Sequence, residues 1–222
     1  MQELRKKNKV HPLFASLEEA ELGEALTLLR AVEQSYKKGE ILRRAGEPFF
    51  SFGIVLSGRI EVYMEDFDGG RMMMASVGEG DSFGESLAYL HTEESPVFVF
   101  AAEDARVVWL DASFFRSYQT ASLPLLLRER FVSLLATRAL MQNDRIQILS
   151  KSALRARLVT FFSQCEHRYK SKTFRVPFDR ASLAVYLGVN RTALSRELSR
   201  MREEGILDFY KDSFRLLQSD HR

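Results

Sequence analysis

Apolar and polar residues alternate with a period of about two from Tyr36 to Leu110, and helical periods replace this alternation on both sides. Short apolar runs in this segment are separated by turns that contain glycine or proline, a pattern typical of an all-β sandwich or roll. We therefore predict one β unit here, with strands at 41–42, 52–56, 59–64, 72–77, 97–101 and 107–110.

Helical patterns flank the β unit. Ser16, Leu17, Glu18 and Glu19 are interpreted as a capping box that starts a short helix. After Pro124 a long helix is predicted over 125–150, because that stretch contains no glycine or proline. Its apolar stripe packs either on the β unit or against a second copy of the helix. The stripe consists of Leu127, Phe131, Leu134, Met141 and Ile148, and it is interrupted by Arg138 and Arg145.

The C-terminal third contains a helix at 154–167, a polar basic loop and then two short helices joined by a tight turn. Gly188 ends the first short helix in a left-handed conformation, and Asn190 caps the second. A hairpin with strands at 206–210 and 214–217 follows, with Lys211 at its tip. The inner stripe of the second short helix is Ala193, Leu194, Leu198 and Met201.

The outer face of this second helix carries the groups that bind base edges and phosphates, namely guanidinium forks, hydroxyls and an amide. A helix-turn-helix places such a face in the DNA major groove, whereas a helical hairpin with a solvated basic face is the simpler alternative. The candidate DNA-binding residues are Asn190, Arg191, Thr192, Ser195, Arg196, Ser199 and Arg200, together with Lys211 on the hairpin.

The charge distribution supports the DNA interpretation. The net charge is only +2, but the segment from Lys151 onward carries +7 and the rest carries −5. The first residues lack the apolar region of a signal peptide and no apolar run has the length of a membrane helix, so we expect a cytoplasmic protein without a membrane partner. No catalytic motif appears, and we expect neither an enzyme nor a catalytic residue.

Two segments resemble the CRP/FNR superfamily of bacterial transcription regulators. The sequence LGVNRTALSRELSRMREEGIL resembles their helix-turn-helix, with Gly188, Arg191, Ser195 and Arg196 at the matching positions. Thr192 stands where the family has glutamate, which puts the usual half-site preference in doubt. The pieces YKKGEILRRAGEP, FGIVLSGRIEVY and GEGDSFGES resemble the family's cyclic-nucleotide-binding β-roll.

The resemblance implies an α+β protein with three parts. They are a jelly-roll-like, double-stranded β-roll sensor at 1–121, a long dimerisation helix at 122–150 and a winged helix-turn-helix at 151–222. It also implies a homodimer that binds a palindromic DNA operator under allosteric control by a small effector. RNA polymerase is a further partner if the protein is an activator.

The resemblance also implies an effector site, with changes. In the family a Gly-Glu pair holds the ribose of a cyclic nucleotide, and a later arginine pairs with the phosphate. This chain keeps Gly84, Glu85 and Ser86, but Ser95 stands at the arginine position. Because a buried phosphate without a cation is costly, we expect an effector other than cyclic AMP, and a cyclic-nucleotide-dependent regulator remains the alternative. Gln142 and Asn143 either line the pocket or lie on the surface.

Other members of the superfamily sense through iron–sulfur clusters or haem. A cluster is not expected, because Cys165 is the only cysteine. Haem requires an axial ligand, for which His91 and His11 are the candidates, and a haem-based gas sensor remains a second alternative. No metal site is expected, and the cofactor stays unknown.

Overall fold

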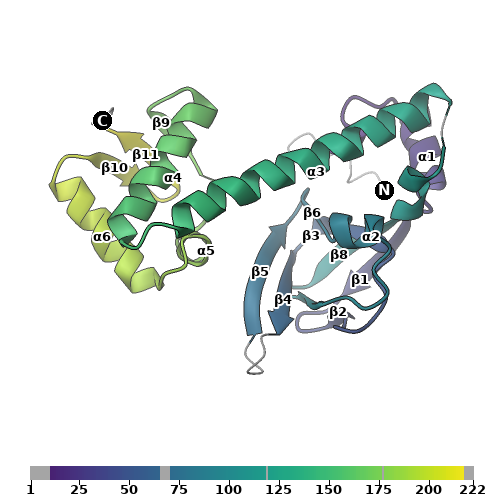
Figure 1. Ribbon diagram of the computed structural model, residues 1–222, viewed down its shortest axis with the longest axis horizontal. Coiled ribbons are helices and arrows are strands. Elements are labelled where there is room, and N and C mark those ends of the chain that lie inside the picture. The colour runs from purple at the N-terminus through teal and green to yellow at the C-terminus, as the bar shows by residue number, and fades with distance from the viewer. Residues whose placement is uncertain (1–10, 66–70, 119, 177, 218–222) are drawn as a thin grey trace. The chain divides into compact units, whose positions relative to one another are not determined.

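The computed structural model describes residues 11–65, 71–118, 120–176 and 178–217. Contacts along the chain divide it into an N-terminal unit, Met1–Ala136, and a C-terminal unit, Thr137–Arg222. In Figure 1 the first unit contains the two larger β-sheets, and the second contains the short helices and a small sheet near the C-terminus. One helix, α3 (Ser122–Leu149), begins in the first unit and ends in the second.

The N-terminal unit contains two antiparallel four-stranded sheets, which confirms the predicted β-roll. One sheet has the order β1 (Val32–Tyr36), β8 (Ala105–Asp111), β3 (Ser51–Ser57) and β6 (Ser82–Phe83). The other has the order β2 (Ile41–Arg43), β7 (Val97–Ala101), β4 (Arg59–Glu65) and β5 (Arg71–Gly78). The pattern did not predict β1 or β6, because β1 is mostly exposed and β6 has only two residues.

Short helical elements cover the roll. They are η2 (Pro12–Phe14), α1 (Glu19–Leu28), α2 (Glu85–Tyr89) and η3 (Ala112–Arg116). The predicted capping box at Ser16 is wrong, because Ser16 has a positive φ of 59° in the turn before α1. Glu18 is the N-cap instead, and its backbone N–H donates to the Glu21 carboxylate at 2.9 Å.

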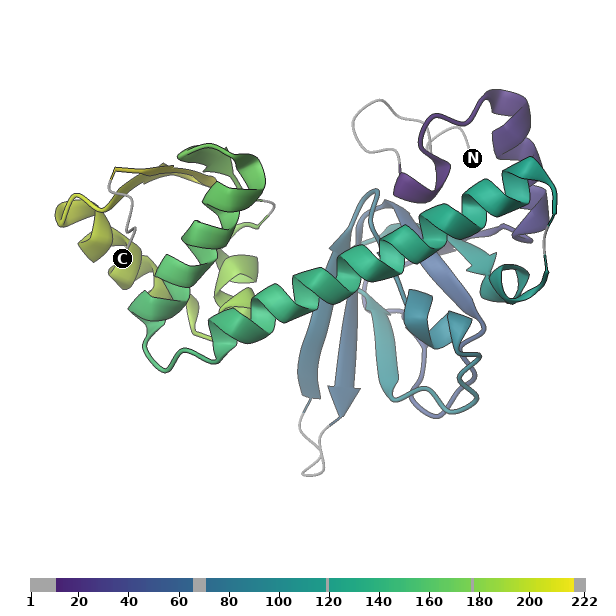
Figure 2. The ribbon, with the colours of Figure 1, turned by 45° about the horizontal axis from the view of Figure 1, so that its top comes forward.

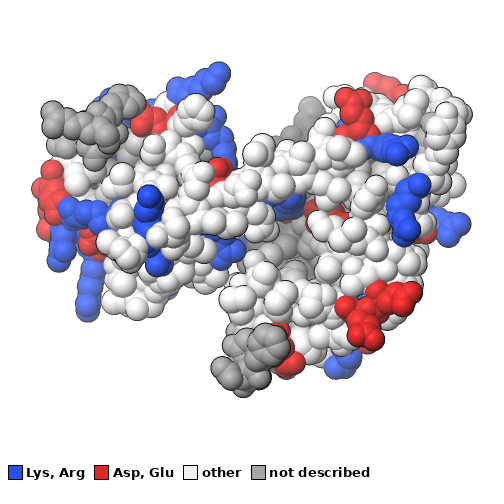
Figure 3. Space-filling view, in the orientation of Figure 1, with Lys and Arg blue, Asp and Glu red and all other residues white. Residues whose placement is uncertain are grey.

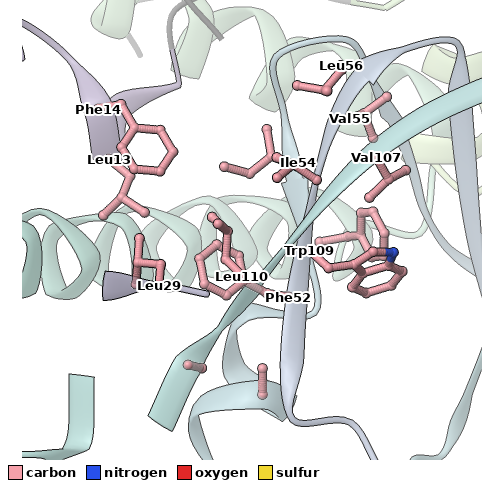
Figure 4. Close-up of a cluster of buried hydrophobic side chains, with 14 of the residues drawn as sticks. Leu13, Phe14, Leu29, Phe52, Ile54, Val55, Leu56, Val107, Trp109 and Leu110 are labelled. Carbon is pink, nitrogen blue, oxygen red and sulfur yellow. The ribbon is translucent and has the colours of Figure 1, made fainter. Parts of the chain in front are cut away.

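The side chains of β3 and β8 alternate between two sides of their sheet, as the 2-residue period of a strand requires (Figure 4). Phe52 and Leu110 lie on the same side of the sheet as Leu29, which follows α1. Val107 and Trp109 lie on the other side. All five side chains are buried. The first side is completed by α3, where the Phe131 ring stacks on Phe115 with centroids 4.0 Å apart.

Helix α3 begins earlier than predicted and has Pro124 in its first turn. Proline is tolerated there because the first N–H groups of a helix have no intrahelical acceptor. Leu127 and Phe131 are buried in the N-terminal core and Ile148 in the C-terminal core, whereas Met141 is 39% exposed. The predicted stripe therefore packs mainly within its own chain. Other apolar side chains of α3 are exposed, namely Leu125, Val132, Leu140, Ile146 and Leu149.

The C-terminal unit packs three helices and a small sheet around its own core (Figure 2). The helices are α4 (Leu154–Tyr169), α5 (Arg180–Tyr186) and α6 (Arg191–Glu203). The sheet has the order β10 (Leu207–Tyr210), β11 (Ser213–Leu216) and β9 (Thr173–Arg175). The predicted hairpin is confirmed as β10 and β11, but β9 lies within the segment expected to be a loop. Three residues of mixed character gave no strand signal.

Replacement of Phe131 by alanine is expected to destabilise the folded protein by about 3–5 kcal/mol, because it leaves a cavity between Phe52, Phe115 and Tyr89. Urea unfolding followed by circular dichroism measures this loss. Leu90→Ala is the control, since the Leu90 side chain is 72% exposed. Equal destabilisation by both substitutions would contradict the role assigned to the Phe131 stack.

Candidate DNA interface and sensor site

The turn between α5 and α6 has the geometry that its sequence predicted. Gly188 has φ +65°, in the left-handed region that favours glycine. Arg157 of α4 donates from Nη1 to the carbonyl oxygen of Leu187 at 2.9 Å, which satisfies the end of α5. Asn190 Oδ1 accepts the backbone N–H of Ala193 at 2.7 Å and is therefore the N-cap of α6.

Helix α6 buries one side and exposes the other. Leu194, Leu198 and Met201 are buried as predicted, and Ala193 is partly exposed. The outer face therefore lies open to a partner along the whole helix. It consists of the exposed residues Asn190, Arg191, Thr192, Ser195, Arg196, Ser199 and Arg200.

Ion pairs hold the inner edge of α6 on its neighbours. Arg155 of α4 donates from Nε to Glu197 at 2.6 Å and forms a two-pronged pair with Glu204, at 2.5 and 2.8 Å. At the end of the helix, Arg202 pairs with Asp208 of β10 at 2.8 Å. Sequence reasoning missed the two pairs of Arg155, because their partners lie 42 and 49 residues away along the chain.

Arg191 and Arg196 differ from these anchoring arginines. Within the described part of the chain, neither side chain has a hydrogen bond or an ion pair. Arg200 is less free, since its Nη1 lies 3.8 Å from Glu197 Oε2. The guanidinium groups of Arg191 and Arg196 are therefore available to an external acceptor.

Arg180, at the start of α5, adds to the positive charge near Arg191. Its guanidinium donates to the Lys211 carbonyl at 3.0 Å and lies 4.9 Å from the centre of the Phe209 ring. Burial lowers the pKa of Arg180, and repulsion from Arg191 and Arg202 lowers it further. Apart from its charge, Arg180 carried no signal of this role in the amino-acid pattern. The gathered cations favour an anion beside the N-terminus of α6.

Lys211 lies at the tip of the β10–β11 hairpin, where its φ is +55°. The side chain is exposed, and its Nζ lies 5.5 Å from the ring centre of Tyr210, which is also exposed. In the space-filling view, Lys and Arg side chains lie over the surface of the C-terminal unit (Figure 3). The hairpin thus presents a cation of the kind that contacts DNA phosphates.

At the predicted effector site, Gly84 and Glu85 have structural roles. Gly84 has φ +79°, and a Cβ at this position would clash with the Phe49 ring. The buried Glu85 carboxylate accepts the Ser82 hydroxyl at 2.5 Å, and Ser82 Oγ lies 2.9 Å from His11 Nε2. His11 Nδ1 accepts the Leu13 N–H, so Nε2 is the donor to Ser82 in this arrangement.

The remaining predicted effector residues are in different environments. Ser86 follows Glu85 in α2 and is exposed. Ser95 is buried, and its hydroxyl accepts the Val97 N–H at 3.3 Å. Gln142 and Asn143 are exposed on α3 in the C-terminal unit. Their assignment to an effector pocket stays a prediction.

The cofactor candidates have ordinary surroundings. Burial raises the pKa of the Cys165 thiol to about 11, so the thiolate that binds metals is disfavoured at neutral pH. The His91 ring stacks on Phe50 with centroids 3.8 Å apart. Among the described residues there is no cluster of three or more His, Cys, Asp or Glu side chains suited to a metal ion.

The Arg155–Glu204 pair predicts how stability changes with pH. Hydrogen bonds from Arg155 lower the pKa of Glu204, so the pair stabilises the fold above the pKa of the unfolded state. This contribution is lost as the pH falls through the lowered pKa. Arg155→Met is therefore expected to reduce the thermal unfolding temperature near neutral pH, with a difference that shrinks between about pH 5 and pH 3.

Lys151→Met is the matched control, because it also replaces a cation of the C-terminal unit but Lys151 is exposed and has no ion pair among the described residues. A loss of stability in Arg155→Met that does not depend on pH would contradict the electrostatic account of the anchor.

Comparisons with known proteins agree with these two halves of the molecule. Residues 33–121 match the family model of the cyclic nucleotide-binding domain, and residues 156–220 match the Crp-like helix-turn-helix domain. Within the described residues, no helix has the length and apolar character needed to cross a bilayer.

Similar proteins include the transcriptional activator protein FnrA of Stutzerimonas stutzeri, which is 27% identical over 188 residues (82% of this chain and 75% of FnrA). Electron transport regulator A of Shewanella oneidensis is 25% identical over 177 residues (78% of this chain and 69% of the relative).

Two solved structures share the fold. FixK2 from Bradyrhizobium japonicum has a TM-score of 0.57 at 24% identity, over 85% of this chain and 93% of FixK2. A CooA mutant from Carboxydothermus hydrogenoformans has a TM-score of 0.60 at 20% identity, over 96% and 93% of the two chains. The two domain matches, in this order, together with the relatives, show that the chain belongs to the CRP/FNR family of transcription regulators, which bind DNA as dimers and are not enzymes.

Proposed function

We propose that this regulator binds a palindromic operator by placing α6 of each subunit in the DNA major groove. The observation that carries the proposal is the state of Arg191 and Arg196. Both are exposed, and neither has a hydrogen bond or ion pair among the described residues, whereas Arg155 and Arg202 of the same unit are engaged in ion pairs. A helix that is anchored on one edge and has free guanidinium groups on the other is suited to contact base edges in the DNA major groove.

Each side chain of the face has a proposed partner on the duplex. Arg191 and Arg196 bind the O6 and N7 atoms of guanine, which accept the two donors of a guanidinium fork. Thr192 and Ser195 support them with hydroxyl groups, and the Thr192 methyl group suits a thymine methyl. Phosphates are the proposed partners of the remaining candidates, namely Asn190, Ser199, Arg200 and Lys211, with Arg180 adding to the local field.

The dimer is proposed to form through the exposed face of α3. Leu125, Val132 and Asn143 fall within about 20° of one another at 100° per residue, and Leu140 and Ile146 lie on the two sides of that line. This face is separate from the stripe that Leu127 and Phe131 bury. The proposed parts of the chain remain the roll at 1–121, the dimerisation helix at 122–150 and the winged helix-turn-helix at 151–222.

The effector is proposed to be a small molecule other than cyclic AMP that acts through the roll on the spacing of the two α6 helices. Those helices must meet successive major grooves about 34 Å apart. The hydrogen bond from Ser82 to Glu85 supports this proposal, because a ribose would have to share that buried carboxylate with Ser82. RNA polymerase is a partner if the protein activates transcription. Because the target is chromosomal DNA, the proposed place of action is the cytoplasm.

Arg191→Ala and Arg196→Ala are each expected to weaken operator binding by about 1–3 kcal/mol, if the fork binds two atoms of one base. Selection from random duplexes first identifies the operator, and fluorescence anisotropy then measures its affinity at fixed salt. Arg44→Ala is the control, because it removes one exposed positive charge from the N-terminal unit. Operator affinity that is unchanged in both α6 variants would refute the assignment.

Charged substitutions on the exposed face of α3 are expected to separate the subunits. Val132→Glu and Leu140→Glu would each bury a carboxylate in the proposed seam, which is costly without a partner. Sedimentation analysis should then show the mass of a single 25.5 kDa chain. Met141→Glu makes the same apolar-to-carboxylate change on α3, at an exposed position about 160° from the line through Leu125 and Asn143. Dimers that persist in the first two variants would contradict this seam.

A further inference from the structure

An arginine of one sheet of the roll lies over a tryptophan of the other. Arg43 ends β2, and its guanidinium carbon lies 4.1 Å from the ring centre of Trp109 in β8. The two strands belong to different sheets, so this contact bridges them. Trp109 is buried and Arg43 is partly exposed. The pair thus places a cation at a point where buried aromatic surface meets the exterior.

The tryptophan ring is held in place by its neighbours. The indole Nε1–H donates to the Tyr36 hydroxyl at 2.9 Å, and that hydroxyl is also hydrogen-bonded to Gln34. The rings of Trp109 and Phe83 are nearly perpendicular, with centroids 5.3 Å apart. A ring fixed in this way gives the guanidinium a rigid platform, which reduces the conformational entropy that the Arg43 side chain would lose when a ligand binds.

The Arg43 charge is not neutralised by an ion pair. One of its donors, Nη1, is used by the carbonyl oxygen of Leu42 at 2.8 Å, and within the described ranges no carboxylate lies within 4 Å of the guanidinium. Elsewhere in the same unit Arg106 pairs with Glu33 and Arg59 with Glu103. A partly buried cation keeps a stronger field than one in bulk water, and its remaining donors favour an anion.

The acidic residue Glu40 acts on the same tyrosine as Arg43. Glu40 and Arg43 both influence the pKa of Tyr36, in opposite directions. The Glu40 carboxylate accepts the backbone N–H of Lys37 at 2.8 Å, which fixes it in the turn between β1 and β2. Glu40 therefore forms no ion pair with Arg43, whose only hydrogen bond among the described residues is the one from Nη1 to Leu42.

We propose that Arg43, supported by Trp109 and Tyr36, binds a small anion that carries a carboxylate or a phosphate group. The guanidinium fork matches the two oxygens of either group. The cation would then come from β2 and not from the position of Ser95, where the sequence lacks one. The inference rests on the proposed function in one respect, namely that this anion is the effector of the regulator.

Trp109 makes the proposal directly measurable, because it is the only tryptophan in the chain. The full-length protein is titrated with benzoate and, separately, with phenyl phosphate, while tryptophan fluorescence is recorded at constant ionic strength. We expect a saturable change with a Kd below about 1 mM for at least one of them. Benzamide, which has the shape of benzoate without its charge, is expected to produce no such change.

Variants assign the signal to the guanidinium group. Arg43→Met keeps the length of the side chain but removes the charge, and it is expected to weaken binding at least about tenfold. If this variant does not fold, Arg43→Gln replaces it with the same expectation. Arg44→Met, at the exposed neighbouring position, is expected to bind as the native protein does. A response to benzoate alone assigns a carboxylate ligand, and a response to phenyl phosphate alone assigns a phosphate ligand.

The proposal is overturned if neither anion gives a saturable change, if benzamide acts as benzoate does, or if binding is unchanged in the Arg43 variant. Operator binding by the same samples is measured separately. Intact operator binding without an anion response overturns the anion site and leaves the proposed function standing. An Arg43-dependent response in a protein that binds no operator supports the site but contradicts its role as an effector site.

Discussion

The structure depends on a single uninterrupted helix that contributes to both hydrophobic cores and also has an exposed apolar face. Helix α3 buries Leu127 and Phe131 among the aromatic rings of the N-terminal unit and buries Ile148 in the core of the C-terminal unit. A third face, which includes Val132 and Leu140, remains exposed. A helix of 3.6 residues per turn can serve all three only if apolar residues are spread around it, and α3 shows this distribution.

Local signals along the sequence were sufficient for most of the fold. Gly188 and Asn190 predicted a turn and a helix start because their conformations depend on neighbouring residues. Strand β7 was predicted with its observed bounds because VFVFA is a short, continuous run of apolar residues that mostly favour strands. The signals failed for strand β1, which is mostly exposed and so lacks a buried apolar face. They also failed on α3, which has one buried and one exposed apolar face, because the sequence did not show which of them the chain itself covers. Periodicity identifies an apolar face but does not name the surface that covers it.

The candidate site was predictable in the same uneven way. The outer face of α6 follows from helical spacing alone, whereas the pairs of Arg155 with Glu197 and Glu204 depend on contacts between distant segments. Glu85 illustrates the limit of reading a motif. The residue is present where the family resemblance expects it, yet its carboxylate is bound to Ser82. The identity of a side chain therefore did not determine its partner.

The burial of Cys165 has a practical consequence for anyone who studies motion in this regulator. The native thiol is shielded and stays protonated at neutral pH, since its pKa is raised to about 11. A cysteine introduced at an exposed position such as Glu203, at the end of α6, would therefore take up a spin label or dye selectively in the otherwise native chain. In a dimer, two such labels would report the distance between the two α6 helices, and Cys165 would not have to be replaced first.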